Sequence, residues 1–236
     1  MTQATRSPLG PAVAGGVVGA ALTAIVLLFA IPQFVSSRIV REGMLSDPQI
    51  LVETADALRD RQYAPTIGAN RTALETPFAS SWKGAAKPDV VLVEFFDYAC
   101  PYCKASNPHI DRLIKDDPGL RVVYREMPIL GQDSIVSARL SMAASRAGRF
   151  QQFHDALYAA GRPSPETNAA AARAANIPLA LTDDPAVEAE LKRNFQLAGQ
   201  LGASGTPVFV VGDRVLNGAV GYDALKSAVE DARKKG

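Results

Sequence analysis

Apolar residues form one long run near the start of the chain and several short runs later. Residues 12–31 carry no charged side chain, and this is the length at which a helix crosses a bilayer core. No clear Ala-x-Ala cleavage site follows Ile31. We therefore predict a transmembrane anchor at 12–31 after a short tail at 1–11, with a cleaved export signal as the alternative.

Residues 32–84 predict a helical stalk or linker. Ser46 is placed as an N-cap, and apolar residues then recur with helical spacing at Leu51, Ala55 and Leu58. This spacing predicts a helix to about Tyr63, with an apolar stripe too narrow to anchor a domain. Two interpretations stay open, a segment that self-associates through this stripe and a solvated spacer.

A different pattern begins near residue 85, where we place the start of the main domain, 85–236. Val90–Phe96 is a nearly continuous apolar run of strand length. A helix is predicted from Cys100 to Asp116 and a second strand from Leu120 to about Met127. Strand, helix and strand in this order indicate a parallel right-handed crossover, and hence an α/β fold.

The segment at about 131–202 reads as a helical insertion into this α/β domain. Helix starts are suggested at Ser134, at Ser164 and at Thr182, and a stop at Gly202. After the insertion, the alternation of apolar runs and turn residues predicts a hairpin and a final helix. These elements span 208–211, 215–217 and 222–234.

Composition narrows the function. The 236 residues carry 25 basic and 24 acidic side chains with no basic stripe, so we expect no nucleic-acid partner. The chain has only two cysteines, Cys100 and Cys103, so several disulfides are impossible and the two must act as a pair.

The pair Cys100 and Cys103 lies at the predicted start of a helix, directly after a strand. Two cysteines at this spacing can close a disulfide reversibly. The helix dipole favours the thiolate of Cys100, which predicts it as the nucleophile, and Cys103, one turn deeper, as the resolving thiol. The alternative is a soft-metal site for copper or zinc, but the only imidazoles, His109 and His154, do not match a zinc-ligand spacing. We predict no metal site.

The two residues between the cysteines fit the redox interpretation. Pro101 suits the first helical turn, where its missing N–H costs nothing. Tyr102 offers a ring against which a substrate can rest. We therefore expect Pro101 and Tyr102 to contact substrate.

The motifs together resemble the DsbA-like branch of the thioredoxin superfamily, with its DsbA-, DsbG- and ScsC-like bacterial members. The run 93–104, which contains Cys-Pro-Tyr-Cys, resembles the active-site block of that family, and 205–209, Gly-Thr-Pro-Val-Phe, resembles its second signature. The helical insertion lies where the family carries one, so the resemblance covers about 85–234. It implies a thioredoxin-like fold and thiol:disulfide oxidoreductase activity.

The resemblance also implies roles for three residues. Pro207 would follow a cis peptide bond opposite the two sulfurs, and Thr206 would pair its backbone with a bound substrate chain. Glu94 would be a buried carboxyl that helps to move the proton of the deeper thiol. The simpler alternatives are a trans Thr206–Pro207 bond and a solvent-facing Glu94 at a strand edge.

Some features leave the direction of electron flow open. The central dipeptide is Pro-Tyr and not the Pro-His associated with the strongest oxidants. Oxidase, isomerase and reductase activity therefore all stay open as interpretations. Residues 47–74 are similar to the N-terminal stalk of ScsC-like members, some of which oligomerise through it. This similarity adds weight to the possibility of a homo-oligomer.

The predicted anchor and chemistry suggest a place for the protein in a cell. A redox disulfide suits an oxidising compartment, so we expect a single-pass protein of the bacterial inner membrane with its catalytic domain in the periplasm. The partners would be exported cysteine-containing proteins and a membrane redox partner. The Cys100–Cys103 disulfide would be the only redox group, with no separate cofactor.

Overall fold

The computed structural model describes residues 31–179 and 184–235. The chain divides into two compact units, 1–57 and 58–236, and each is described by itself. The anchor predicted at 12–31 lies, except for its last residue, outside the described part. Within that part, no helix is long and apolar enough to cross a membrane.

The first unit contains α2 (Ile31–Ser46) and the beginning of α3 (Gln49–Glu75). Ser46 ends α2 and does not cap the next helix, because its hydroxyl donates to the carbonyl of Gly43 at 3.0 Å. Asp47 takes the predicted capping role, since its Oδ1 accepts the amide of Gln49 at 3.1 Å. The predicted N-cap at Ser46 was therefore wrong, because the capping side chain is that of Asp47 and α3 begins at Gln49.

The end of α3 corrects the predicted domain boundary. The helix does not stop near Tyr63 but continues past Pro65 to Glu75. Its last turns bury Ile67 and Leu74 against the sheet. The compact unit that carries the sheet therefore starts at Leu58, not near residue 85.

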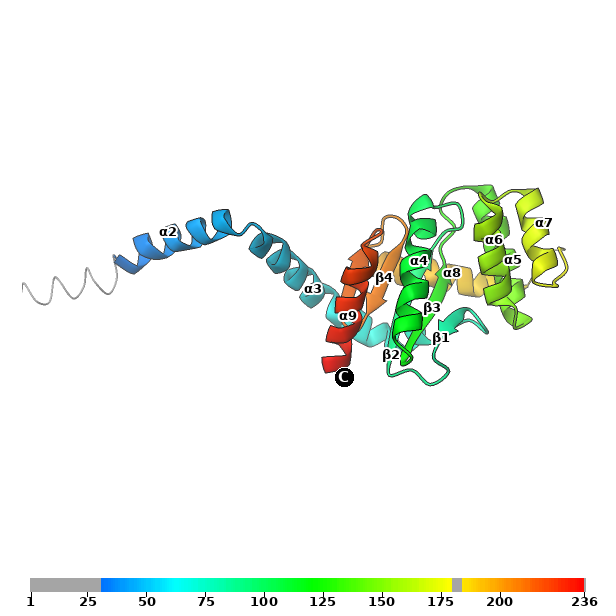
Figure 1. The fold of residues 1–236 in the computed structure, drawn as a ribbon, viewed down its shortest axis with the longest axis horizontal. Helices are drawn as coiled ribbons and strands as arrows, with labels where there is room; N and C mark the ends of the chain where they lie inside the picture. Colours follow the sequence, from blue (N-terminus) through cyan, green and yellow to red (C-terminus); the bar gives the residue numbers. More distant parts are fainter. Residues whose placement is uncertain (1–30, 180–183, 236) are drawn as a thin grey trace, which may run out of the picture. The chain divides into compact units, whose positions relative to one another are not determined.

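A five-stranded mixed sheet forms the centre of the second unit (Figure 1). Its order is β1-β3-β2-β4-β5, with β2 parallel to β3 and the other neighbours antiparallel. The strands are β1 (Trp82–Gly84), β2 (Val90–Phe96), β3 (Leu120–Glu126), β4 (Val208–Val211) and β5 (Arg214–Asn217). The predicted crossover and hairpin are confirmed, whereas β1 was not predicted.

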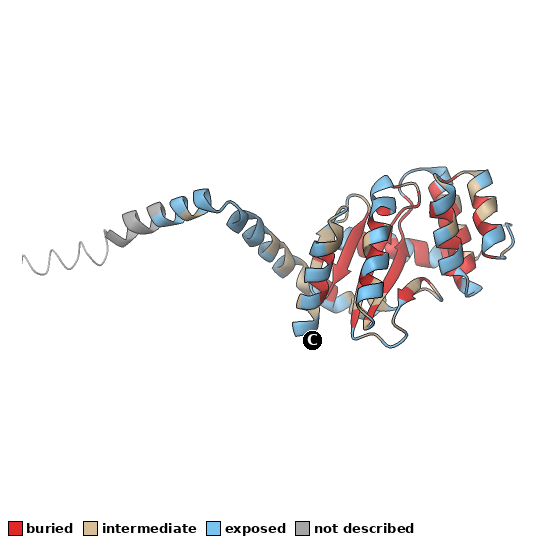
Figure 2. Cartoon of the chain, viewed as in Figure 1, coloured by how far each residue is buried: buried red, intermediate tan, exposed pale blue. Residues whose placement is uncertain are grey.

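Helices cover both faces of this sheet, whose three central strands, β3, β2 and β4, are almost entirely buried (Figure 2). One face packs on α4 (Pro101–Asp116), α9 (Gly221–Lys235) and residues 140–175 of the helical insertion. The other face packs on the end of α3 and on α8 (Pro185–Gln200). Alternate residues of β2 and β3 therefore serve two cores, as expected for strands buried on both faces.

The helical insertion predicted at 131–202 is confirmed between β3 and β4. It consists of α5 (Gln132–Arg146), α6 (Phe150–Ala160), α7 (Pro165–Ala174) and α8. Ser164 caps α7 through a capping box with Thr167, as its sequence suggested. The other two starts differ, because Gly131 precedes α5 in place of Ser134, and Asp184 caps α8; Thr182 lies outside the described residues.

Candidate active site

Cys100 lies at the boundary between the end of β2 and the beginning of α4. It is the N-cap residue of α4, with extended backbone angles (φ −81°, ψ 117°) and Pro101 as the first helical residue. Cys100 therefore lies at the N-terminal end of α4, where the first backbone amides have no partner within the helix. Pro101 and Tyr102 are exposed, Tyr102 by 64%, so both are available to a binding partner.

Cys103 lies one turn further along α4 and faces the core. Its side chain is fully buried, whereas Cys100 is 4% exposed. Burial raises the pKa of the Cys103 thiol well above its usual range, and the charge of Glu94 raises it further. The two thiols therefore differ little in exposure, although the sequence predicted that only Cys103 is shielded. They differ mainly in their positions along α4.

The second predicted signature lies opposite the first cysteine. The Thr206–Pro207 peptide bond is cis, so the trans alternative is excluded. The thiol of Cys100 donates to the backbone oxygen of Thr206 at 3.2 Å. Pro207 is buried and Thr206 half-buried, which places the backbone of Thr206 at the mouth of the site.

Glu94 points into the same core as the two cysteines. It is 1% exposed, and neither of its carboxyl oxygens has a hydrogen-bond partner among the described residues. Burial raises the pKa of Glu94 to about 8 against the opposing charge of Lys83, and the charges of Cys100 and Asp111 raise it further. The solvent-facing alternative is therefore excluded, and Glu94 titrates in the range useful for proton transfer.

Two further buried carboxyls near the site were missed from the sequence. Asp97, at the end of β2, accepts the amide of Ala99 at 2.8 Å and the amides of Ile129 and Leu130 at 2.8 and 2.9 Å. It thereby ties the active-site turn to the loop after β3. Burial raises the pKa of the second carboxyl, Glu126, and the charges of Asp97 and Glu94 add to this effect. The only sequence signal was an acidic residue at the end of each apolar strand.

The two histidines do not join the cysteines. His154 is buried among aromatic rings, and its Nδ1 lies 3.2 Å from the hydroxyl of Tyr98. Burial lowers its pKa well below the usual value, so it is neutral. His109 is half-buried on α4. Across 31–179 and 184–235, no group of three His, Cys, Asp or Glu side chains could hold a metal ion.

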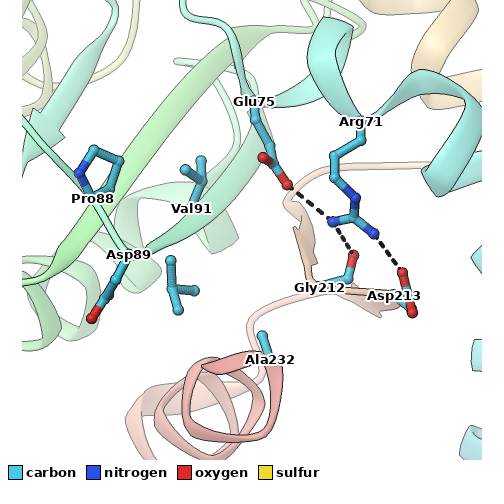
Figure 3. Close-up of a pocket in the computed structure, with 9 residues that line it drawn as sticks. Arg71, Glu75, Pro88, Asp89, Val91, Gly212, Asp213 and Ala232 are labelled. Atoms are coloured by element: carbon cyan, nitrogen blue, oxygen red, sulfur yellow. Dashed lines mark hydrogen bonds and ion pairs between the residues drawn. The ribbon is translucent and has the colours of Figure 1, made fainter. Parts of the chain in front are cut away.

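A hollow of about 560 Å³ lies at the other end of the sheet from the cysteines. It is lined by the start of β2, by the turn between β4 and β5, and by Arg71 and Glu75 of α3 (Figure 3). None of the predicted site residues lines it. The candidate active site lies instead around Cys100 and Thr206, with Tyr102 exposed beside them.

Several solved structures share this fold. The catalytic domain of Proteus mirabilis ScsC is 28% identical, with a TM-score of 0.67 over 73% of this chain and 99% of that chain. A thioredoxin-like oxidoreductase from Silicibacter pomeroyi is 37% identical, with a TM-score of 0.65 over 70% of this chain and 98% of that chain. A periplasmic thioredoxin-like protein from Salmonella enterica is 29% identical, with a TM-score of 0.64 over 70% and 95% of the two chains.

Curated relatives match over a similar length. The Na(+)/H(+) antiporter NhaA 1 of Salinispora arenicola is 28% identical over 157 residues, which is 64% of this chain and 24% of the antiporter. The chain thus spans about a quarter of the length of the curated relatives it matches.

Residues 91–230, well over half of the chain, match the family described as the DSBA-like thioredoxin domain. This range contains both cysteines, the Thr206–Pro207 bond and the whole helical insertion. Proteins of this kind are oxidoreductases that act on disulfides. The chain belongs to the DSBA-like thioredoxin domain family.

Proposed function

We propose that this protein is a thiol:disulfide oxidoreductase that forms or rearranges disulfide bonds in exported proteins through Cys100 and Cys103. The observation that carries the proposal is the contact between the Cys100 sulfur and the Thr206 backbone oxygen, 3.2 Å apart. A client chain paired with Thr206 in strand fashion would bring its own sulfur close to Cys100.

The oxidised enzyme would form a disulfide in two exchanges. A client thiolate attacks the Cys100 sulfur, so a client–Cys100 bond forms, the Cys100–Cys103 bond breaks, and Cys103 leaves with the electron pair. A second client thiolate then attacks the client sulfur of this mixed disulfide, and Cys100 leaves as a thiolate. The client is oxidised by two electrons, which the enzyme holds as two thiols. A membrane redox partner would return the pair to the disulfide.

Glu94 supports this scheme as the proton carrier for Cys103. The departing Cys103 sulfur is fully buried, where a thiolate is costly. A carboxyl with a pKa of about 8 is largely protonated at neutral pH and can give that sulfur a proton. In the reverse reaction, the ionised Glu94 would accept the proton before Cys103 attacks.

Client contact would involve the exposed residues around Cys100. Pro101 and Tyr102 present an apolar surface beside the sulfur, and Thr206 supplies the backbone groups for pairing. The cis Pro207 has no N–H, so it leaves the side of the site facing the sulfurs free of a backbone donor.

We place the catalytic domain in the periplasm, tethered to the bacterial inner membrane by 12–31. The support is the uncharged apolar run in the sequence and the redox chemistry of Cys100 and Cys103. A protease added to sealed spheroplasts should digest the chain after Ser36. Protection of this part, under conditions that digest known periplasmic domains, would contradict the orientation.

The stalk would let the protein self-associate. Its predicted stripe is exposed, with Leu51 and Leu58 exposed by 51% and 68%, and burying it between copies is favourable. Several Cys100 thiolates could then act on one client, which would favour isomerisation. Light scattering on forms that begin at Phe34 and at Arg59 tests this, because the second form lacks the stripe but keeps the part of α3 that packs on the sheet. If both forms are monomers, the stalk is only a spacer.

A redox titration tests the proposed function itself. In glutathione buffers of graded ratio, we expect two thiols to convert reversibly into one intramolecular disulfide, with a single two-electron midpoint. That midpoint also decides the direction of electron flow. Failure to form the disulfide, together with tight binding of copper or zinc by the reduced protein, would favour the metal-handling alternative.

A further inference from the structure

The loop that carries Thr206 begins at a specific turn at the end of α8. The amide of Ala203 donates to Ala198 at 3.0 Å, and the amide of Gly202 donates to Gly199 at 3.1 Å. These two bonds define a Schellman motif, with Gly202 in the left-handed position (φ +68°). Gly202 therefore sets the direction in which the chain leaves α8 towards Thr206, four residues further on.

Tyr63 of α3 occupies the space beside this glycine. A Cβ atom built on Gly202 would overlap the hydroxyl oxygen of Tyr63 and lie 3.1 Å from its Cζ. The Tyr63 side chain is half-buried and packs against the core that contains Leu201, the residue before the glycine. The aromatic ring thus supports the turn directly.

The part of α3 that follows Tyr63 is fastened to the domain at three more places. Asn70 donates to the side chain of Gln200, the last residue of α8, at 3.1 Å. Arg71 donates to the carbonyl of Gly212 at 3.1 Å and pairs with Asp213 at 2.5 Å, as Figure 3 shows. Ile67 is buried in the core shared with Leu201. Tyr63 is therefore held on a helix that has little freedom to move against α8.

The other end of the loop is also fixed. The backbone oxygen of Thr206 accepts from Cys100, and the carbonyl of Pro207 accepts the amide of Gly218 at 2.9 Å. A change at Gly202 must therefore be absorbed within residues 203–206. These are the residues whose backbone would pair with a client chain.

We infer that Tyr63 is a positioning residue for polypeptide binding, acting through Gly202 on the backbone of Thr206. The inference rests on the proposed function, since it takes Thr206 as the client-pairing site. It gives α3 a role in the catalytic cycle beyond linking the domain to the preceding segment. The substrate class whose reaction depends on Tyr63 is an extended polypeptide, not a small disulfide.

The test compares two substrates on the full chain. One is a cysteine-containing polypeptide with a single disulfide, and the other is oxidised glutathione, which has no strand to pair. For Tyr63→Ala and Gly202→Ala, the ratio of kcat/KM for the polypeptide to kcat/KM for glutathione should fall about tenfold. The reason is that a small displacement of the Thr206 backbone weakens its pairing with the polypeptide and does not affect glutathione. Most of the loss should lie in KM.

Two further variants make the result specific. Tyr63→Phe removes the oxygen that the added Cβ would overlap, so Tyr63→Phe combined with Gly202→Ala should recover part of the Gly202→Ala loss. Gly148→Ala is the matched control, because Gly148 ends α5 in the same motif with φ +71°, and a Cβ atom added there would meet no atom of the described residues within 4 Å. Gly148→Ala should lose about as much stability as Gly202→Ala from the alanine in a left-handed position, and it should leave the ratio of the two kcat/KM values unchanged.

The outcomes separate the two claims. A ratio that stays at the wild-type value in Tyr63→Ala and Gly202→Ala, or falls equally in Gly148→Ala, would overturn the inference while wild-type exchange stands. Wild-type protein that exchanges with neither substrate would overturn the proposed function, and the inference with it.

Discussion

The sulfur of Cys100 lies 3.2 Å from the backbone oxygen of Thr206, a residue 106 positions further along the chain. The N-terminal end of α4, which carries Cys100, and the loop that carries Thr206 are thereby brought to one point. The sheet makes this possible, because β2, which leads into Cys100, pairs directly with β4, which follows Pro207. Cys103, which is fully buried, and Glu94, which is 1% exposed, lie in the core beneath this contact.

Substituting Glu94 by Gln should change how stability depends on pH. The pKa of Glu94 is about 8 in the folded protein against about 4.5 when unperturbed, so between these values the folded state keeps a proton that the unfolded chain loses. Wild-type stability is thus greatest below the lower pKa and falls towards pH 8, by up to about 1.4 kcal/mol per pH unit. The Gln variant has no such proton. Urea unfolding across this window should show its advantage over wild type increasing with pH, and a constant difference would contradict the raised pKa.

Substituting Arg125 by Ala should destabilise the catalytic unit severely. The side chain is 2% exposed, pairs with Glu190 at 2.7 Å, and donates to the carbonyls of Leu74 and Thr76 at the end of α3 at 3.0 and 2.8 Å. Its loss leaves buried acceptors unpaired, which we expect to cost about 3 kcal/mol or more. Denaturant unfolding measures this cost.

The control for Arg125 is Arg139→Ala. Arg139 pairs with Glu188 at 2.6 Å, but the two side chains are far less buried, with 36% and 51% of their surface exposed. Such a pair contributes about 1 kcal/mol or less. Equal losses of unfolding free energy in the two variants would show that the buried contacts of Arg125 contribute no more to stability than the Arg139–Glu188 pair.

Substituting Asp97 by Ala should loosen the loop after β3. The carboxylate accepts three backbone amides, those of Ala99, Ile129 and Leu130. Removing it should cost about 2 kcal/mol, and Asp97→Asn, which keeps one acceptor oxygen, should cost less. Hydrogen exchange should become faster at the amides of Ile129 and Leu130 in the Ala variant. Unchanged protection there would contradict the assigned role.

Local patterns allowed much of the fold to be predicted. Val90–Phe96 was identified as a strand because a run buried on both faces is continuously apolar, and Ser164 as a cap because the capping box is local. The end of α3 was placed too early, because the burial of Leu74 depends on a sheet that is distant in the sequence. Strand β1 is only three residues long and carries Lys83 in its centre, so it leaves almost no pattern.

The residues of the candidate site likewise divide into those that local sequence patterns predicted and those that they did not. Cys100 and Cys103 were apparent from spacing and context, whereas Thr206, Pro207 and Glu94 came from the family resemblance. Asp97 and Glu126 were missed, because the importance of a carboxyl at a strand end depends on partners such as Ile129 and Leu130, 32 and 33 positions away. Tyr63 gave no signal for the same reason.

The most direct test of the account is to trap the reaction intermediate with single-cysteine variants. Cys100 in Cys103→Ser should attack a client disulfide, form a Cys100–client bond and release one client thiolate, and the mixed disulfide should persist because no resolving thiol is present. In Cys100→Ser the remaining thiol, Cys103, lies one turn further along α4 and has a raised pKa, so it should form almost none. We therefore measure mixed disulfide by mass under non-reducing conditions for both variants with one disulfide-containing polypeptide. Accumulation in Cys103→Ser alone is the predicted result, and equal accumulation in the two variants, or more in Cys100→Ser, would contradict the assignment of nucleophile and resolving thiol.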